Sequence, residues 1–238
     1  MSKKRPFAKI ALHLKQNQCF QMEINNKKAI VLGASGLVGN QLVRLLLKDN
    51  SFSQVTLFVR KELSFLDNKL KQIILDFDDL ESYQLQFDCS VLFLCIGTTR
   101  KKTPNLENYR AIDYGITLRA ANLAKSAGIE EVHLISSIGA SSDSSIFYNK
   151  LKGEIEEDLI KIGFESTYIY QPSMLIGTRG ESRPAELFFQ KLMPLFDLFM
   201  IGKLKKYLSV SKEKLAQAIL NHHLNAKKGV HILTFGDF

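Results

Sequence analysis

The chain has 238 residues, of which 45% are hydrophobic and 24% charged, a balance typical of a soluble globular protein with one large domain. No segment approaches the roughly 18 consecutive apolar residues that cross a membrane, and no apolar segment follows the basic N-terminus, so neither a transmembrane segment nor export is expected. The net charge of +8 would suit binding to a nucleic acid. The lysines, however, are spread along the chain without a basic patch interleaved with aromatic residues, and anionic small-molecule ligands explain the charge equally well. No nucleic-acid partner is therefore expected.

The three cysteines, Cys19, Cys89 and Cys95, are odd in number and lack the spacing of a metal or redox motif. Two of them lie in apolar, strand-like surroundings. Free buried thiols are typical of a reducing compartment, so we expect a cytoplasmic protein.

Alternating short apolar runs and helical periodicity begin at Lys28 and indicate βαβ units. Residues 1–27 form an N-terminal extension whose pattern fits either a strand or a helix. Strands are predicted at Ala29–Leu32, Val55–Val59, Gln72–Leu75, Val91–Cys95, Glu131–Ser136 and Ser166–Gln171. Helices are predicted at Gly36–Asp49, Leu106–Ala127, Ile146–Ile162, Ala185–Phe199 and Lys212–His222. The sequence therefore predicts an α/β fold, with a Rossmann-type doubly wound parallel sheet and a small C-terminal substrate-binding part. Residues 28–238 would form one domain, with a cofactor half at 28–162 and a substrate half at 163–238.

Three glycines, Gly33, Gly36 and Gly39, join the first predicted strand to the first predicted helix. A dinucleotide pyrophosphate needs this order of strand, glycine turn and helix. Gly33 would allow the tight turn, Gly36 would let backbone N–H groups approach a phosphate, and Gly39 would let the helix lie close to the strand. The alternative is a tight turn without a ligand.

The end of the second predicted strand bears on which nicotinamide cofactor binds. An NAD site usually has an acidic residue roughly 20 positions after the glycines, but here the strand is followed by Arg60 and Lys61. A guanidinium can bind a 2′-phosphate through two hydrogen bonds. The sequence thus favours NADPH or NADP over NADH, and the alternative is a solvated basic turn.

Two further strand ends would lie at the same edge of the sheet. Asp76, after the third strand, can accept from an adenine amino group, although Asp78 or Asp79 would also suit a helix N-cap. Ile96, Gly97 and Thr98 follow the fourth strand, and the carboxyl edge of a doubly wound sheet borders the ligand crevice.

Catalytic chemistry is indicated by Tyr148 and Lys152, which would share one face of a helix. A free phenol titrates near ~10, and a nearby ammonium group stabilises its phenolate. The phenol can then donate a proton to a carbonyl oxygen as hydride arrives, or accept it in reverse. Ser137, or alternatively Ser136, can hydrogen-bond to that oxygen.

Two features of the C-terminal part have structural interpretations. The apolar stretch from Phe188 to Ile201, which Pro194 should kink, is interpreted as a buried helix pair. The alternatives are an apolar substrate wall, a subunit contact or, because Lys203, Lys205 and Lys206 follow, a membrane-surface helix. His222, His223 and His231 read as surface residues, because no third ligand has suitable spacing, and no metal site is expected.

Taken together, these motifs resemble the short-chain dehydrogenase/reductases, in particular the atypical branch of Tat-interacting-protein oxidoreductases. The resemblance covers roughly Lys28 to Phe196. It rests on the segments Gly33–Gly39, Val55–Arg60, Asp76–Asp78, Cys95–Arg100, Ser136–Ala140, Tyr148–Glu154, Gln171–Gly177 and Glu181–Pro184.

The resemblance implies NADPH at the glycine turn, with Tyr148 and Lys152 as the catalytic pair. It also implies phosphate contacts at Ser35, Gly36, Leu37 and Val38, 2′-phosphate contacts at Arg60 and Lys61, and ribose contacts at Ile96 and Gly97. Leu175 would lie near the nicotinamide and Arg183 at the rim of the cofactor or substrate. Two residues depart from the family pattern: Gln171 replaces an arginine, and Asp113 replaces the asparagine of the proton relay.

The sequence therefore predicts an NADPH-dependent oxidoreductase that acts on a carbonyl-like small molecule, as a monomer or homodimer. The alternative is an NADPH-sensing regulatory or scaffold protein with little catalytic activity.

Overall fold

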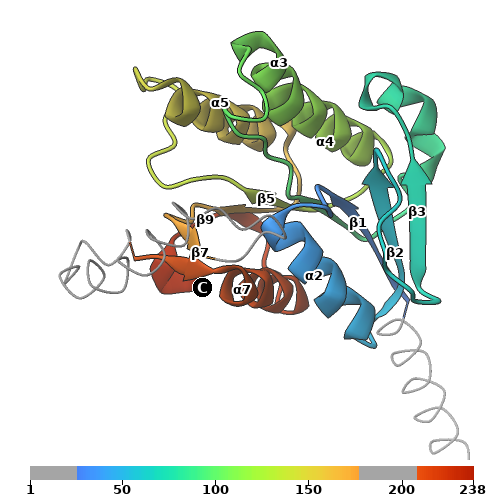
Figure 1. The fold of residues 1–238 in the computed structure, drawn as a ribbon. Coiled ribbons are helices and arrows are strands. Elements are labelled where there is room, and N and C mark those ends of the chain that lie inside the picture. Colours follow the sequence, from blue (N-terminus) through green and yellow to red (C-terminus); the bar gives the residue numbers. More distant parts are fainter. Residues whose placement is uncertain (1–25, 177–207) are drawn as a thin grey trace, which may run out of the picture.

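The computed structural model describes residues 26–176 and 208–238, and its centre is a parallel sheet of seven strands in the order β3-β2-β1-β4-β5-β6-β9 (Figure 1). The strands are β1 (Lys27–Leu32), β2 (Phe52–Val59), β3 (Leu70–Ile74), β4 (Val91–Leu94), β5 (Glu131–Ile135), β6 (Ser166–Tyr170) and β9 (Gly229–Leu233). A two-stranded parallel sheet is formed by β7 (Leu175–Ile176) and β8 (Val210–Ser211). The α/β, doubly wound fold expected from the sequence is confirmed.

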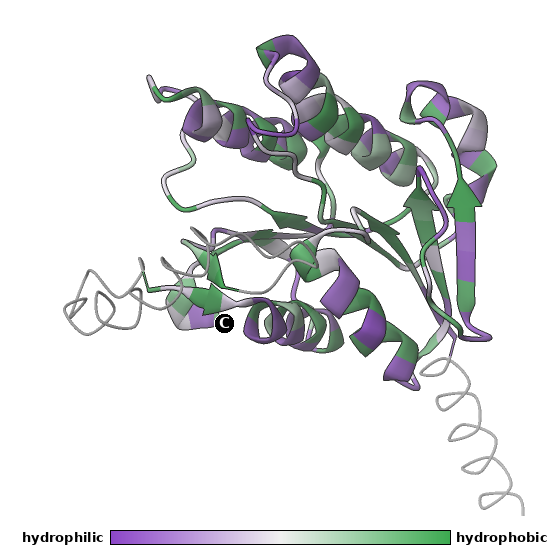
Figure 2. Ribbon diagram, in the orientation of Figure 1, coloured by the Kyte–Doolittle hydropathy of each residue, from purple (hydrophilic) through white to green (hydrophobic). Residues whose placement is uncertain are grey.

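Helices cover both faces of the large sheet (Figure 1). One layer contains α2 (Leu37–Lys48) and α7 (Lys212–Leu224), and the other contains α3 (Leu106–Arg110), α4 (Thr117–Ser126) and α5 (Phe147–Ile162). Short 3-10 helices occur at Phe77–Gln86 (η1) and Phe235–Asp237 (η4). The strands carry mostly hydrophobic residues and the helices turn their hydrophobic sides toward the sheet (Figure 2). Two buried apolar clusters result, one on each face of the sheet.

The order of strands places the ligand edge of the sheet. Leu32, the last residue of β1, lies opposite Phe58 of β2 and Leu94 of β4. After β1, the chain adds β2 and β3 on one side of it and then β4, β5 and β6 on the other. The residues that follow β1, β2 and β4 therefore meet at one edge of the sheet, at the point where the strand order reverses. In doubly wound sheets this is where ligands bind.

The structure corrects two predicted elements. The helix expected at Leu106–Ala127 is split into α3, a π-helical turn (η2, Ala111–Ile116) and α4. Side-chain periodicity does not reveal a change of backbone hydrogen-bond register, so the π-helical turn could not be predicted from the sequence. The edge strand β9 was not predicted. Its outward residues Val230 and Ile232 are about half exposed, so it lacks the continuous burial of the inner strands.

Several expectations fall outside the described residues: the extension up to residue 25, the helix Ala185–Phe199 and the apolar stretch from Phe188 to Ile201. The division into a cofactor half and a substrate half stays a prediction. Residues 163–238 contribute β6, β9 and α7 to the same layered unit. Among the described helices, none is long and apolar enough to cross a membrane.

Candidate functional site: the carboxyl edge of the sheet

The glycine turn after β1 leaves no space for side chains. Gly33 has a φ of +86°, and a Cβ there would lie 2.3 Å from the carbonyl oxygen of Cys95. A Cβ at Gly39 would lie 2.3 Å from the carbonyl oxygen of Gly33, so α2 approaches the strand as closely as the sequence predicts. The two glycines bring α2 against the ends of β1 and β4.

The N-terminus of α2 is free to bind an anion. Gly36 is the N-cap residue, no side chain caps the helix, and its first turn contains no acidic residue. Among the residues that the structure describes, the N–H groups of Leu37, Val38 and Gly39 therefore have no side-chain partner, and the helix dipole adds partial positive charge. Ser35 is exposed beside them. These features fit the pyrophosphate of a dinucleotide.

The predicted adenosine side of the site lies at the ends of β2 and β3. Arg60 and Lys61 directly follow β2, are exposed, and make no hydrogen bond or ion pair within the described part of the chain. Asp76 is exposed too, but its Oδ1 accepts from the backbone N–H of Asp78 (3.1 Å) and caps η1. The N-cap role that the sequence offered for Asp78 or Asp79 thus belongs to Asp76, whose contact with adenine stays a prediction.

The loop after β4 is held by a buried carboxylate. Asp113 is 1% exposed, and its Oδ1 accepts from the backbone N–H of Thr98 (2.8 Å). The Thr98 hydroxyl bonds to that of Thr103, and the Thr98 carbonyl accepts from the Tyr109 hydroxyl (3.1 Å). Ile96 is half-buried and Gly97 exposed. Since the polar groups of Thr98 are used inside the protein, its main role in this structure is to anchor the loop; its cofactor contact stays a prediction.

Asp113 also contacts the predicted catalytic lysine. Lys152 Nζ lies 3.1 Å from Asp113 Oδ2, and the two side chains are 5% and 0% exposed. Tyr148 stands one turn earlier in α5, is 39% exposed, and its hydroxyl has no hydrogen bond to the residues described. Tyr148 and Lys152 thus share a helix face, and Asp113 joins that face to the loop at Thr98.

The two candidate serines have different environments. Ser136 is buried and donates to Glu156, whose carboxylate also accepts from Gln171 Nε2 (2.9 and 3.1 Å). Burial raises the pKa of Glu156, against the hydrogen bonds from Ser136 and Gln171 and the charge of Lys152. Ser137 is half-buried, and its one hydrogen bond to the described part of the chain is a long contact of 3.3 Å with the carbonyl of Ile138. Ser137 is therefore the serine whose hydroxyl is available.

Two predicted contact residues lie apart from these. Leu175 is half-buried in β7 and packs against the cluster beneath α2 and α7. Arg183 lies outside the described residues. The sequence missed Glu156, although it follows Lys152 by one helical turn and could have been found as a second acidic group on that face.

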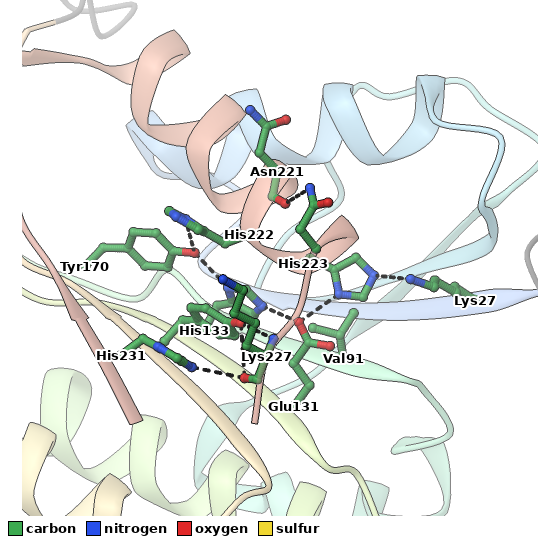
Figure 3. A network of polar contacts seen from close by, with 12 residues as sticks. Lys27, Val91, Glu131, His133, Tyr170, Asn221, His222, His223, Lys227 and His231 are labelled. Carbon is green, nitrogen blue, oxygen red and sulfur yellow. Dashed lines mark hydrogen bonds and ion pairs between the residues drawn. The ribbon is translucent and has the colours of Figure 1, made fainter. Parts of the chain in front are cut away.

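The structure corrects the interpretation of the histidines. His223 is 3% exposed, and its Nδ1 lies 2.9 Å from Glu131 Oε1, which also contacts His133 Nε2 at 2.7 Å (Figure 3). These three residues bring possible metal-ligand atoms within 4.8 Å of one another, at the opposite end of the strands from the glycine turn. The signal in the sequence was helical spacing, because His223 lies four residues after the buried Ile219.

Neighbouring groups satisfy this cluster without an ion. Lys27 Nζ, which can only donate, lies 3.3 Å from His223 Nε2, so the proton of His223 is on Nδ1 and points to Glu131. The ionised Glu131 likewise receives the Nε2 proton of His133, whose Nδ1 accepts from the Tyr170 hydroxyl (3.0 Å). Burial opposes the charge of Glu131, but the hydrogen bonds from His133 and His223 lower its pKa to about 2. The expectation of no metal site stays a prediction.

The cluster makes stability depend on pH. Burial lowers the pKa of His133 to about 4, against the hydrogen bond from Glu131, which raises it. Between pH 6.5 and 4 the unfolded chain therefore binds a proton at His133 that the folded chain does not. Stability should fall with falling pH by about 1.4 kcal/mol per unit, or roughly 2 kcal/mol from pH 6.5 to 5. Protonation of Glu131 also lowers stability as the pH falls, and it does so between pH 4.5 and pH 2.

Urea unfolding at pH 7 and pH 5 measures this effect. Between pH 7 and pH 5, His133→Gln should lose less stability than the wild type. The control is His231→Gln, which replaces a histidine of the edge strand β9 and should lose as much stability as the wild type. Equal losses in the wild type and His133→Gln would contradict the assignment of the effect to His133.

Comparisons with known proteins agree with this geometry. A family described as NAD(P)H-binding matches residues 33–166, more than half of the chain. Protein HTATIP2 of Rattus norvegicus is 37% identical over 182 residues, covering 75% of this chain and 74% of the rat protein. Protein FMP52 of Candida albicans is 38% identical over 157 residues (64% and 69%), and fmp52-1 of Aspergillus terreus is 33% identical over 207 residues (84% and 88%).

Both fungal proteins are named mitochondrial, which contradicts the cytoplasmic location expected from the cysteines. Free buried thiols indicate reducing conditions and do not identify a compartment.

Solved structures share the fold. The UDP-N-acetylglucosamine 4-epimerase of Methanobrevibacter ruminantium has a TM-score of 0.67 at 16% identity, over 89% of this chain and 77% of its own. A wide-type short-chain dehydrogenase/reductase of Veillonella parvula, in complex with NADP, has a TM-score of 0.56 at 15% identity, over 84% and 88%. With its glycine turn and these relatives, the chain belongs to the NAD(P)H-binding family, among proteins similar to atypical short-chain dehydrogenase/reductases.

Proposed function

We propose that this protein is an NADPH-dependent oxidoreductase that transfers hydride reversibly between the cofactor and a carbonyl-like small molecule. The observation that carries the proposal is the buried Lys152, which lies one helical turn from the accessible Tyr148 and is joined through Asp113 to the loop at Thr98. A lysine that is only structural would not need an exposed phenol beside it at the ligand edge of the sheet.

Each residue has a definite part in this reaction. A bound nicotinamide would supply or accept the hydride. Ser137 would hold the substrate oxygen, and Tyr148 would donate a proton to it or remove one in reverse. The ammonium of Lys152 would stabilise the charge that forms on the phenol, while Asp113 keeps Lys152 in place. We take the substrate to be small and the protein to be a monomer or homodimer; the names of the fungal relatives support a mitochondrial location.

The preference for NADPH rests on Arg60 and Lys61. Both stand at the carboxyl edge, beside the end of β1, and neither is paired with an acidic residue in the described ranges. A charged hydrogen bond contributes more than a neutral one, about 1.5–3 kcal/mol. The adenosine ribose of NADH offers these side chains only a neutral 2′-hydroxyl in place of the 2′-phosphate.

A paired titration with NADPH and NADH tests this proposal. We expect NADPH to bind more tightly, and Arg60→Ser to weaken NADPH binding roughly tenfold to a hundredfold while leaving NADH binding nearly unchanged. Nicotinamide fluorescence and thermal unfolding would report both affinities. Lys228→Ser is the control, because it removes the same charge at the amino-terminal end of β9. Failure to bind either cofactor would contradict the proposed function; equal binding would contradict the NADPH preference.

A second candidate is NADPH sensing with little catalysis. It is favoured by the ion pair between Asp113 and Lys152, in which the carboxylate offsets the charge that would act on Tyr148. Co-purification of protein partners with NADPH or NADP present tests it: the partner should change with the redox state of the cofactor. A carbonyl compound turned over at the Tyr148 site would exclude it.

A further inference from the structure

The connection between β2 and β3 carries Arg60 and Lys61 and is fixed by a side chain on the neighbouring strand. The backbone N–H of Leu63 donates to Gln72 Oε1 (2.9 Å), and Gln72 Nε2 donates to the carbonyl of Leu63 (2.8 Å). One amide side chain therefore satisfies both backbone groups of one loop residue. We call this pair of hydrogen bonds the Gln72–Leu63 clamp.

Gln72 occupies a position where an apolar residue would be expected. It lies in β3 opposite the buried Leu57, whose cluster faces α2 and α7. The hydrophilic part of β3 is visible in Figure 2, and it contains Lys71 and Gln72. Because β3 is an edge strand, the loop can fold over this face and give the amide both of its partners. Polar side chains that are half-buried need such partners.

A second contact ties the same loop to the helix of the glycine turn. Phe65 packs against the cluster beneath α2, and the guanidinium carbon of Arg44, in α2, lies 5.2 Å from the centre of its ring. The backbone N–H of Phe65 also donates to the carbonyl of Leu63 (2.8 Å). Leu63 and Phe65 are thus held by β3 and by α2 at once.

Only Arg60, Lys61 and Glu62 stand between the end of β2 and the clamp. Val59 is held on the other side, because its carbonyl accepts from the N–H of Leu75 (3.0 Å). The turn is therefore short and fixed at both ends, while its basic side chains are exposed and unpaired within the described ranges. A ligand that meets groups already in position does not have to supply the free energy that orders them.

We propose that Gln72 is a positioning residue for cofactor selectivity: it holds the Arg60–Glu62 turn so that its basic side chains can bind the 2′-phosphate of NADPH. The inference rests on the proposed NADPH preference and deepens it. Gln72 acts through the backbone of Leu63 and would not touch the cofactor. Its effect should therefore appear only for ligands that carry a 2′-phosphate.

Gln72→Met tests the inference, since methionine keeps the length and apolar contacts of glutamine and removes both hydrogen bonds. We expect the dissociation constants of NADPH and of adenosine 2′-phosphate to rise roughly fivefold to tenfold, and that of NADH to change less than about twofold. Hydrogen exchange of the Leu63 amide should become faster. Gln54→Met, in neighbouring β2, is the matched control and should leave the affinities unchanged, because the Gln54 amide donates to Thr56 within the same strand and not to the loop.

Arg60→Ser separates the two ways in which the inference can fail. If Arg60→Ser weakens NADPH selectively and Gln72→Met does not, the inference is overturned and the NADPH preference stands. If Arg60→Ser leaves the ratio of NADPH to NADH affinity unchanged, both are overturned. Should Gln72→Met fail to fold, Phe65→Leu tests the same loop from the α2 side. It should lower NADPH affinity in the same direction by a smaller factor, and an unchanged affinity would overturn the inference.

Discussion

Replacing Tyr148 with phenylalanine is expected to lower turnover by roughly 10²- to 10⁴-fold, the usual contribution of a general acid or base. NADPH affinity should stay within about twofold, because the ring remains and only the proton-donating oxygen is lost. Stability should also be unchanged, since the hydroxyl is accessible and has no hydrogen bond to the described residues. The variant therefore isolates chemistry from folding and from cofactor binding.

The measurement is NADPH oxidation with the carbonyl compound that the wild-type protein reduces fastest, together with a cofactor titration and a urea unfolding curve. Tyr83→Phe removes a hydroxyl from the 3-10 helix after β3, away from α5, and should behave as the wild type. Turnover that survives in Tyr148→Phe would rule out the phenol as the proton donor and contradict the catalytic roles proposed for Tyr148 and Lys152.

The sequence predicted the parts of this fold that depend on local pattern. The six predicted strands are short and rich in hydrophobic residues. The glycine turn has a steric requirement that any structure of this kind must meet: a Cβ at Gly33 or Gly39 would overlap a backbone carbonyl. Tyr148 and Lys152 share a face because four residues make one helical turn. These signals act within a few residues of one another, so they can be read without the rest of the chain.

Contacts between distant residues could not be predicted in this way. The sequence marks Asp113 as unusual, but its contact with Lys152 requires the π-helical turn, which periodicity does not show. Glu131 and His223 meet because the last turn of α7 lies beside the start of β5, although 92 residues separate them. Gln72 reads as a polar residue in a strand, and its bond to Leu63 depends on the path of the loop.

Replacing Lys152 with methionine is expected to cost roughly 3–5 kcal/mol of stability, because the Asp113 carboxylate would then be buried without its countercharge. Asp113→Asn should cost less, since an asparagine oxygen can still accept from the N–H of Thr98 and Lys152 retains the nearby Glu156. The double variant should recover most of the stability lost in Lys152→Met. Urea unfolding of all four proteins gives the coupling between the two residues.

Lys161→Met is the matched control on the same helix, because Lys161 forms an ion pair with Asp158 in which both side chains are accessible, and it should change stability little. A loss in Lys152→Met as small as in this control would contradict charge compensation at Asp113. The cycle also decides how a loss of activity is to be interpreted. An inactive Lys152→Met could simply be misfolded around Asp113, whereas an inactive double variant with recovered stability would show that the ammonium itself is needed for the reaction.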